Sequence, residues 1–275
     1  GCADGAPVIT TVQIEPTPQA TINNTTAVVC NGGNVNVEIT SLTVPTVPGN
    51  LTFDVAVSST NAPVTGGTAF TNLLAQSFPL TIGGTLTNSS NGTVTVTYTV
   101  TPNLNGCANG APVITTVIVE PTPVTAINNT TATICNTENV SIQITSPTVP
   151  NTPGNLTFDV AVSSTNPGAT GGTAFANLLA QNFPLTISGT LTNSSNSVVT
   201  VTFEVTPKLN GCANGTPVVT TVQVEPSSVA LVNNTIATVC NGGNTNIQIT
   251  SLTTPTIPGN LTFDVAVSST NMGVT

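Results

Sequence analysis

The clearest pattern in the chain is a strict alternation of hydroxyl and apolar side chains at residues 93–100, TVTVTYTV. A period of two is typical of a β-strand with one face in a core and the other in water. Residues 112–121, PVITTVIVEP, follow after a turn with Asn-Gly steps, which tolerate positive φ, so we expect a hairpin. Residues 34–40 and 51–59 alternate in the same way, which predicts a protein built of short strands.

Three further stretches complete one unit of the pattern. Residues 79–88 are a predicted strand whose Gly83-Gly84 pair indicates a bulge or a bend. Residues 26–39, TAVVCNGGNVNVEI, resemble the first hairpin of a sandwich domain, and residues 61–78 remain open between a loop, a short irregular strand and one helical turn near residues 70–76. Seven short strands separated by turn signals predict an all-β, immunoglobulin-like sandwich of two sheets.

This unit recurs without insertion or deletion. Near-identical segments start at Gly1, Gly106 and Gly211, a step of 105 residues, which is the size of one small domain. The predicted domains are residues 1–16 (the last hairpin of a preceding repeat), 17–121, 122–226 and 227–275 (the first part of a further repeat). Short Pro-containing linkers join them, which predicts stiff joints, a rod-like array and a longer tandem array of which this chain is a part.

The composition excludes several functions. The chain has one Lys, no Arg, no His and no Trp among 275 residues, with a net charge of −9. Without basic residues it lacks the electrostatic attraction on which binding to nucleic acids or to anionic membranes depends. No apolar run approaches the roughly 20 residues that span a bilayer, so we expect no membrane insertion.

The motifs of the repeat also resemble a known family. The segments VTVTYTVTP, NGC, PVITTVIVEPTP and VVCNGG are similar to those of PKD-like, Ig-fold repeats that occur in tandem in very large surface proteins of gliding bacteria. Among these, the mobile gliding adhesins of the SprB type are the most similar. The resemblance implies an exported adhesin, although LTFDVAVSS stands where PKD domains proper have a WDFGDG-like strand.

Few residues of the chain are candidates for catalysis or for metal binding. The acids present in every copy are Asp54, Asp159 and Asp264 on a strand and Glu15, Glu120 and Glu225 at the linkers, which we interpret as solvated surface acids. Calcium at the linker is the alternative, but the chain has no D-x-D-x-D-G loop. We therefore predict no catalytic residue, no metal and no cofactor.

Other polar features have ordinary explanations. Asn-x-Ser/Thr sequons, as at Asn24, Asn50, Asn129 and Asn155, arise by chance in a chain rich in Asn and Thr. Threonine-lined faces are typical of strands and do not by themselves indicate an ice-binding surface. A covalent Lys–Asn cross-link cannot be a feature of every repeat, because the position of Lys208 is occupied by Asn103 in the preceding repeat.

The cysteines form two series, Cys2, Cys107, Cys212 and Cys30, Cys135, Cys240. With no C-x-x-C pair and no His, disulfides in an oxidising setting explain them better than metal binding. If the first strand crosses the sandwich, Cys30 and Cys107 lie at opposite ends of one domain, about 30 Å apart, whereas a disulfide needs Cα atoms within about 7 Å. This topology predicts an interdomain Cys30–Cys212 disulfide; if the strand does not cross, the pairs are Cys30–Cys107 and Cys135–Cys212.

The resulting hypothesis is a non-enzymatic stalk or filament segment of a large extracellular adhesin at the bacterial surface, serving adhesion and gliding motility. Its expected partners are further copies of the repeat, with an external surface or glycan bound by other regions. The alternatives are a carbohydrate-binding or spacer array of a secreted enzyme and a surface-layer or sheath protein. A sugar platform needs exposed aromatic rings, and the chain has only eight Phe and one Tyr.

Overall fold

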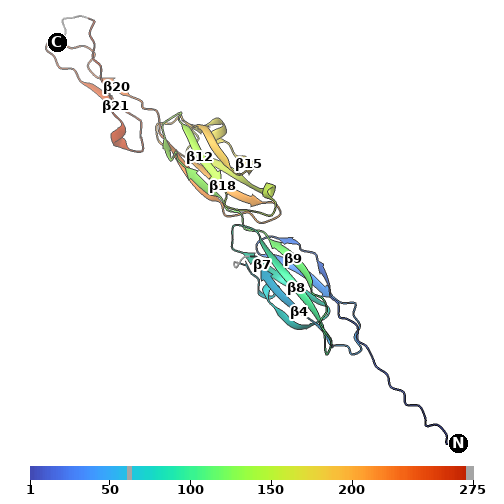
Figure 1. Ribbon diagram of the computed structural model, residues 1–275. Helices are drawn as coiled ribbons and strands as arrows, with labels where there is room; N and C mark the ends of the chain where they lie inside the picture. The colour runs from blue at the N-terminus through green and yellow to red at the C-terminus, as the bar shows by residue number, and fades with distance from the viewer. Residues whose placement is uncertain (61–63, 271–275) are drawn as a thin grey trace. The chain divides into compact units, whose positions relative to one another are not determined.

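The computed structural model describes residues 1–60 and 64–270, and these form strands, short 3-10 turns and connecting segments (Figure 1). The contacts divide the chain into two compact units. Unit 1 consists of Gly1–Thr122, Thr148–Pro153 and Gly211–Ala213, and unit 2 of Pro123–Pro147, Gly154–Asn210 and Asn214–Thr275. The domain boundaries expected from the repeat remain a prediction.

Unit 1 is a sandwich of two sheets. One sheet has the order β1-β3-β7-β5 and the other the order β2-β9-β8-β4-β6. The elements are β1 Thr21–Asn24, β2 Val28–Val29, β3 Gly33–Thr40, β4 Leu51–Ser59, β5 Val64–Thr65, η1 Gly67–Phe70, β6 Leu73–Ser77, β7 Leu80–Asn88, β8 Val94–Leu104 and β9 Val113–Val119. The prediction of a two-sheet, all-β sandwich is confirmed.

Unit 2 contains the same arrangement, with sheets β10-β12-β16 and β11-β19-β18-β13-β15 and the pair β14-β17. Its elements are β10 Ala126–Asn129, β11 Thr133–Ile134, β12 Asn139–Thr145, η2 Pro153–Asn155, β13 Leu156–Ser164, β14 Ala169–Thr170, η3 Gly172–Phe175, β15 Leu178–Asn182, β16 Leu185–Thr190, β17 Thr192–Asn193, β18 Val199–Leu209 and β19 Val218–Val224. Beyond them lie β20 Leu231–Asn234, β21 Ile247–Thr250 and η4 Pro258–Asn260, and β20 pairs with β21.

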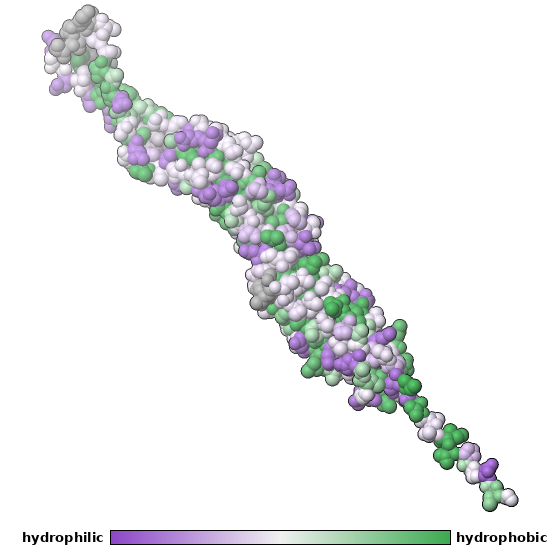
Figure 2. All heavy atoms as spheres, viewed as in Figure 1, coloured by the Kyte–Doolittle hydropathy of each residue, from purple (hydrophilic) through white to green (hydrophobic). Residues whose placement is uncertain are grey.

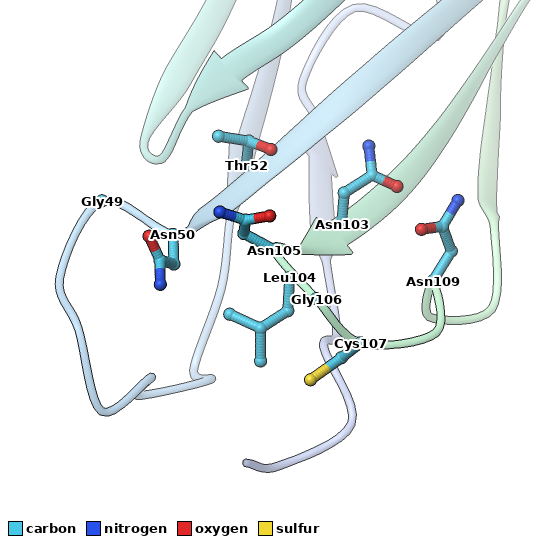
Figure 3. Close-up of a pocket in the computed structure, with 9 residues that line it drawn as sticks. All are labelled: Gly49, Asn50, Thr52, Asn103, Leu104, Asn105, Gly106, Cys107 and Asn109. Carbon is cyan, nitrogen blue, oxygen red and sulfur yellow. The ribbon is translucent and has the colours of Figure 1, made fainter.

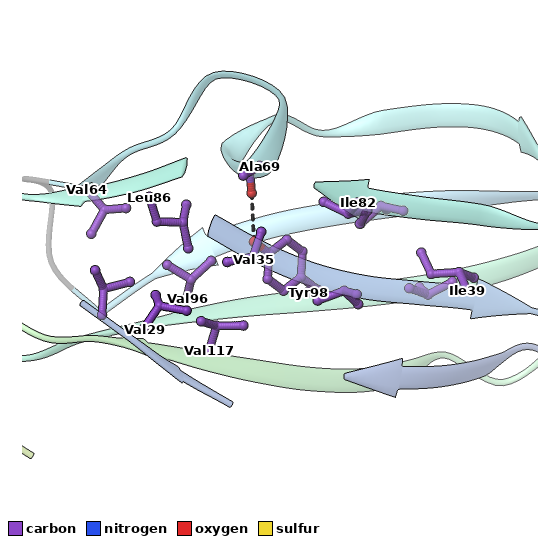
Figure 4. Close-up of a cluster of buried hydrophobic side chains, with 14 of the residues drawn as sticks. Val29, Val35, Ile39, Val64, Ala69, Ile82, Leu86, Val96, Tyr98 and Val117 are labelled. Carbon is purple, nitrogen blue, oxygen red and sulfur yellow. Dashed lines mark hydrogen bonds between the residues drawn. The ribbon is translucent and has the colours of Figure 1, made fainter. Parts of the chain in front are cut away.

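The core of unit 1 follows from the alternation in the sequence. The apolar residues of β8 from Val94 to Val100, Tyr98 included, are fully buried, and β3 and β7 of the other sheet supply the facing side chains (Figure 4). The buried Tyr98 hydroxyl donates a hydrogen bond of 2.7 Å to the carbonyl oxygen of Ala69. In unit 2, Phe203 takes the place of the tyrosine and is equally buried. The outer face is covered mainly by residues of intermediate hydropathy, with hydrophilic and hydrophobic ones between them (Figure 2).

The first strand differs from the prediction. It is split between the two sheets, because β1 pairs antiparallel with β3 whereas β2 pairs parallel with β9. The predicted hairpin at residues 26–39 is therefore wrong, since β2 and β3 lie in different sheets. A tight turn joins them, in which Gly33 N donates to Cys30 O at 2.8 Å and Gly32 has a φ of 75°. The split, together with β5, gives unit 1 nine strands in its described part instead of seven.

The structure shows what residues 64–78 form, which the sequence left undecided, and why a glycine pair follows at Gly83-Gly84. Of residues 61–78, those from Val64 onward form β5, η1 and β6, and residues 61–63 lie outside the described part. The pairing of β7 with β3 runs without a register shift, so the bulge expected at Gly83-Gly84 is absent from that pairing. Gly84 instead has a φ of 127°, and a Cβ there would lie 3.1 Å from the Thr68 hydroxyl in η1.

The hairpin of β8 and β9 is confirmed. Its turn contains Gly110, which donates to Pro102 O at 2.9 Å. A Cβ at Gly110 would lie 1.9 Å from the carbonyl oxygen of Pro18, and one at Gly215 would lie 1.9 Å from that of Pro123. Glycine is therefore required there, because the backbone that leads into the first strand passes directly over the turn.

Candidate functional site

The turn at Cys30 lies where the first strand ends. Because β2 runs parallel to β9, Cys30 comes to lie near the C-terminal end of β9, where Glu120 N donates to Val29 O at 2.8 Å. Cys107 lies in the turn that precedes β9, held by a hydrogen bond from its N–H to Leu104 O at 2.9 Å. The seven residues of β9, about 23 Å of strand, therefore separate the two cysteines.

The structure contains a disulfide between Cys30 and Cys212, with the Cα atoms 5.5 Å apart. Gly211–Ala213 and Cys30 belong to the same compact unit, and the bond closes a separation of 182 residues. Neither alternative pair, Cys30–Cys107 or Cys135–Cys212, is formed in this structure. The formation of this bond in the protein in its native setting stays a prediction. The four other cysteines are free and exposed: Cys2, Cys107, Cys135 and Cys240.

Glu120 is buried, which corrects the interpretation of this linker acid as solvated, whereas Glu15 and Glu225 are partly exposed. Both carboxylate oxygens of Glu120 accept from Asn151 N, at 3.0 and 3.3 Å, and Glu120 is only 7% exposed. Glu15 accepts from Thr46 N at 3.0 Å, and Glu225 accepts from Thr256 N at 3.1 Å.

The hydrogen bonds of these acids define their role. Hydrogen bonds from the Thr46 side chain and backbone lower the pKa of Glu15. Each carboxylate therefore fastens a loop 31 residues further along the chain, which sequence reasoning missed because the partner is a backbone N–H.

The loop held by Glu120 has further hydrogen bonds within unit 1. Val149 N donates to Asn91 O at 2.7 Å, and Thr93 N donates to Val149 O at 3.2 Å. Unit 2 repeats the first of these contacts, from Thr254 N to Asn196 O at 2.7 Å. The segment after each linker is thus tied by backbone bonds as well as by a carboxylate.

The strand acids also have structural partners. Asp54 accepts from Ala75 N at 2.8 Å, and Asp159 accepts from Ala180 N at 2.8 Å. The Ala180 N–H and the neighbouring Lys208 ammonium lower the pKa of Asp159. Asp264 lies in a segment without secondary structure.

Two of the sequon amides are engaged as well. The Asn24 carboxamide donates to Thr115 Oγ1 at 3.1 Å and to Thr116 O at 2.9 Å, and its oxygen accepts from Thr26 N. Asn129 makes the same contacts in unit 2. These amides connect the first strand to the last strand of the sandwich.

A hollow of about 440 Å³ lies beside Cys107 (Figure 3). Asn50 and Thr52 come to it from the start of β4, Asn103 from β8, and Asn105 from the following turn. Its lining contains no charged or aromatic side chain. Such a surface offers amide and hydroxyl groups but neither an acid–base pair nor a stacking platform.

Residues 1–60 and 64–270 contain no cluster of three or more His, Cys, Asp or Glu side chains that could hold a metal ion. The same residues include no helix with the length and apolar character that a membrane crossing requires.

The sandwich sequences match a known family. Residues 27–123 and 132–228 each match the model of the PKD-like domain. The chain belongs to the PKD-like domain family. No curated protein matches this PKD-like chain.

Solved structures similar to this PKD-like chain include three from adhesins. FdeC, an Escherichia coli adhesin, is 15% identical with a TM-score of 0.41, over 76% of this chain and 66% of that one. The D00-D0 domain of intimin is 10% identical, with a TM-score of 0.33 and coverages of 74% and 99%. The Yersinia pseudotuberculosis adhesin InvE is 13% identical, with a TM-score of 0.27 and coverages of 76% and 60%. The chain thus spans slightly less than two thirds of the FdeC and InvE chains.

Proposed function

We propose that this chain is a structural stalk segment of a large extracellular adhesin at a bacterial cell surface, acting in adhesion and gliding motility. The observation that carries the proposal is the Cys30–Cys212 disulfide, which joins residues of two successive PKD-like repeats. Such a bond limits how far a protein extends when it is pulled along its length.

The mechanical effect of the bond follows from chain length. A force applied to the two ends of the chain passes through the disulfide and bypasses the chain between the cysteines, which are 182 positions apart in the sequence. At roughly 3.4 Å per extended residue, the bond withholds about 60 nm of extension. Unfolding of the sandwich between the bonded positions then leaves the stalk at nearly its original length.

The linkers support the same role. Pro121 and Pro123 restrict φ, and Gly215 lets the backbone at Pro123 pass in close contact. Glu120 fastens the loop that follows. A stalk needs joints that bend little, and these contacts restrain the backbone on both sides of the linker.

The proposed location rests on the cysteine chemistry. Disulfides persist in oxidising compartments and are rare in the cytosol. A surface coated with hydroxyls and amides, with few charges, suits an exported domain that acts as a spacer. Recognition of the external surface or glycan then belongs to other regions, and further copies of the repeat extend the reach.

Single-molecule stretching of this chain tests the mechanical role. We expect the fully unfolded oxidised chain to be about 60 nm shorter than the same chain after reduction. A Cys212→Ser variant should give the long extension under both conditions, and Cys135→Ser should behave as the wild type. Equal extension before and after reduction would contradict the mechanism.

A second experiment tests the cellular role in the native host. Antibodies to this chain should label intact cells, and deletion of the repeats should reduce both adhesion and gliding. Labelling that requires cell lysis would exclude a surface stalk, and normal gliding after deletion would exclude the motility role.

A further inference from the structure

A leucine protrudes from one edge strand of each unit. Leu74 on β6 is 73% exposed, and Leu179, at the same position of β15, is 72% exposed. Unit 2 follows a complete PKD-like repeat in this chain and unit 1 does not, yet the exposure is the same. An adjoining repeat therefore leaves this leucine open to solvent.

Side-chain hydrogen bonds fix the backbone on both sides of Leu74. Asn72 Oδ1 accepts from a backbone N–H of β4 at 2.7 Å, and Asp54 Oδ1 accepts from Ala75 N at 2.8 Å. Gln76 Nε2 donates to Leu74 O at 2.7 Å. The leucine is thus presented by a backbone that its own unit holds in place.

Unit 2 repeats this arrangement around Leu179. Asn177 accepts from a backbone N–H of β13 at 2.6 Å, and Gln181 donates to Leu179 O at 2.7 Å. Asp159 accepts from Ala180 N at 2.8 Å, and Ala180 has a φ of 50°, against 49° for the alanine of unit 1. Both units therefore keep the same backbone here, although a positive φ strains alanine.

The occupied backbone groups decide what kind of contact this edge makes. An added strand pairs with free N–H and C=O groups of a sheet edge. At the centre of β6, however, Leu74 O and Ala75 N are already bonded to side chains of the same unit. The apolar side chain therefore makes the contact, without backbone pairing.

The magnitude of one such contact indicates the partner. Burial of one leucine raises an association constant roughly 10- to 150-fold, which is less than the loss of translational and rotational freedom costs two proteins. Only a partner that meets several leucines at once binds, and Leu74 and Leu179 are separated by the 105-residue step of the repeat. A second copy of the chain carries leucines at that same step.

The charges beside the two leucines select the orientation of this copy. Lys208 is the only basic residue of the chain and pairs with Asp159, which accepts from the N–H that follows Leu179. Asp54 lies beside Leu74 without a basic neighbour, since unit 1 contains neither Lys nor Arg. An antiparallel copy brings its Lys208 to Asp54, whereas a parallel copy brings one Asp54 to the other. Such surface pairs add little affinity but discriminate between orientations.

We propose that Leu74 of each chain packs against Leu179 of a second, antiparallel copy of this chain. In the same contact, Lys208 of each copy pairs with Asp54 of the other. Chains that project from two facing cells are antiparallel, so the partner is a copy on a neighbouring cell. The inference rests on the proposed stalk function and deepens it, because the stalk then binds as well as extends. The same residues lie on both sides of the contact, which closes at two chains.

Zero-length cross-linking tests the contact, because Lys208 is the only lysine. A carbodiimide joins an amine to a carboxylate where the two touch, and the reagent takes up the water that is lost. The sample is an equal mixture of isotope-labelled and unlabelled chain with its free thiols alkylated. We expect peptides that join Lys208 of one copy to Asp54 of the other, one labelled and one not. Amides within one chain only, or amides from Lys208 spread over many carboxylates of the second copy, would overturn the proposal.

Leu74→Ser and Leu179→Ser test the leucines without adding charge. Each should reduce the yield of cross-links between copies about tenfold or more, because each removes one side of both leucine contacts. Ile114→Ser is the matched control, since Ile114 is 63% exposed on β9 of the same sheet and its loss should leave the yield unchanged. A yield from Leu74→Ser equal to that of the wild type would overturn the leucine contact.

Sedimentation separates a second copy from other apolar partners. The wild-type chain should dimerise reversibly as its concentration rises. A chain that stays monomeric, and that binds alkyl-coated beads through Leu74, would assign the leucines to an apolar surface and overturn the proposal. Stretching of single chains reports on Cys30–Cys212, so failure here is distinguishable from failure of the stalk function.

Discussion

At the scale of single residues, one hydroxyl distinguishes the cores of the two units. Tyr98 is buried and donates to Ala69 O, whereas Phe203 fills the same place without a hydroxyl. Burial raises the pKa of Tyr98 to about 12, because the phenolate is poorly solvated in the core.

This raised pKa predicts an alkaline transition. The folded state favours the neutral phenol, so its contribution to stability is complete below the ordinary pKa of 10 and is lost as pH rises through about 12. Because Tyr98 is the only tyrosine, phenolate absorbance reports it alone. Ionisation near pH 10 in the folded protein would contradict the prediction, and Tyr98→Phe should remove this part of the alkaline dependence.

Gly110 gives a second prediction at this scale. Gly110→Ala places a Cβ 1.9 Å from Pro18 O, so the backbone must move, and we expect a loss of about 1–3 kcal/mol in the free energy of unfolding. Gly215→Ala should behave alike. Gly154→Ala is the control, because nothing lies within 4 Å of its Cβ. Denaturant unfolding measures all three, and equal values for Gly110→Ala and Gly154→Ala would refute the close approach.

At the scale of elements, the edge strand β6 is shaped by an acid on its neighbour. The register of β4 and β6 shifts between Phe53 and Val55, and Ala75 has a φ of 49°, with its N–H held by Asp54. Such a bulge interrupts the regular row of backbone groups that an exposed sheet edge offers to another chain. Asp54, which recurs in each repeat, therefore stabilises the bulge in the pairing with the edge strand β6.

Ala75→Gly tests this arrangement. Glycine adopts positive φ without strain, so we expect a gain of up to about 1 kcal/mol in the free energy of unfolding. Ala56→Gly, at an ordinary position of β4, should instead cost about 0.5–1 kcal/mol. A loss at Ala75 as large as that at Ala56 would show that the positive φ carries no strain.

Alternation of apolar and polar residues made the long strands predictable, since the buried valines of β3, β4 and β8 lie at every second position. The switch of the first strand between sheets was not predictable, because β2 has only two residues and thus no period. The linker glutamates were identified as repeated positions, but their role was hidden because their partners are backbone groups 31 residues away. The family resemblance is confirmed for the PKD-like domain, and the gliding role stays a proposal.

At the scale of the whole molecule, the scarcity of charge is the dominant feature. Lys208–Asp159 is the one ion pair found in the described ranges, and the net charge is −9. Stability therefore depends on apolar burial and hydrogen bonds, on which salt screening has little effect.

The melting temperature should accordingly change by only a few degrees between low salt and about 1 M sodium chloride. Chloride is the suitable salt, because sulfate strengthens apolar burial directly. A steep rise of the melting temperature with chloride would mean that repulsion among the acids, or an ion site, governs stability.

The central claim is that a disulfide joins residues of successive repeats and so limits the extension of the proposed stalk. The most direct measurement is digestion of the exported, full-length protein without reduction, at acidic pH to prevent exchange, followed by mass spectrometry of the cross-linked peptides. The account predicts a dominant peptide pair that joins TAVVCNGG, with Cys30, to NGCANGTP, with Cys212. A dominant pair that joins TAVVCNGG to NGCANGAP, with Cys107, would contradict it.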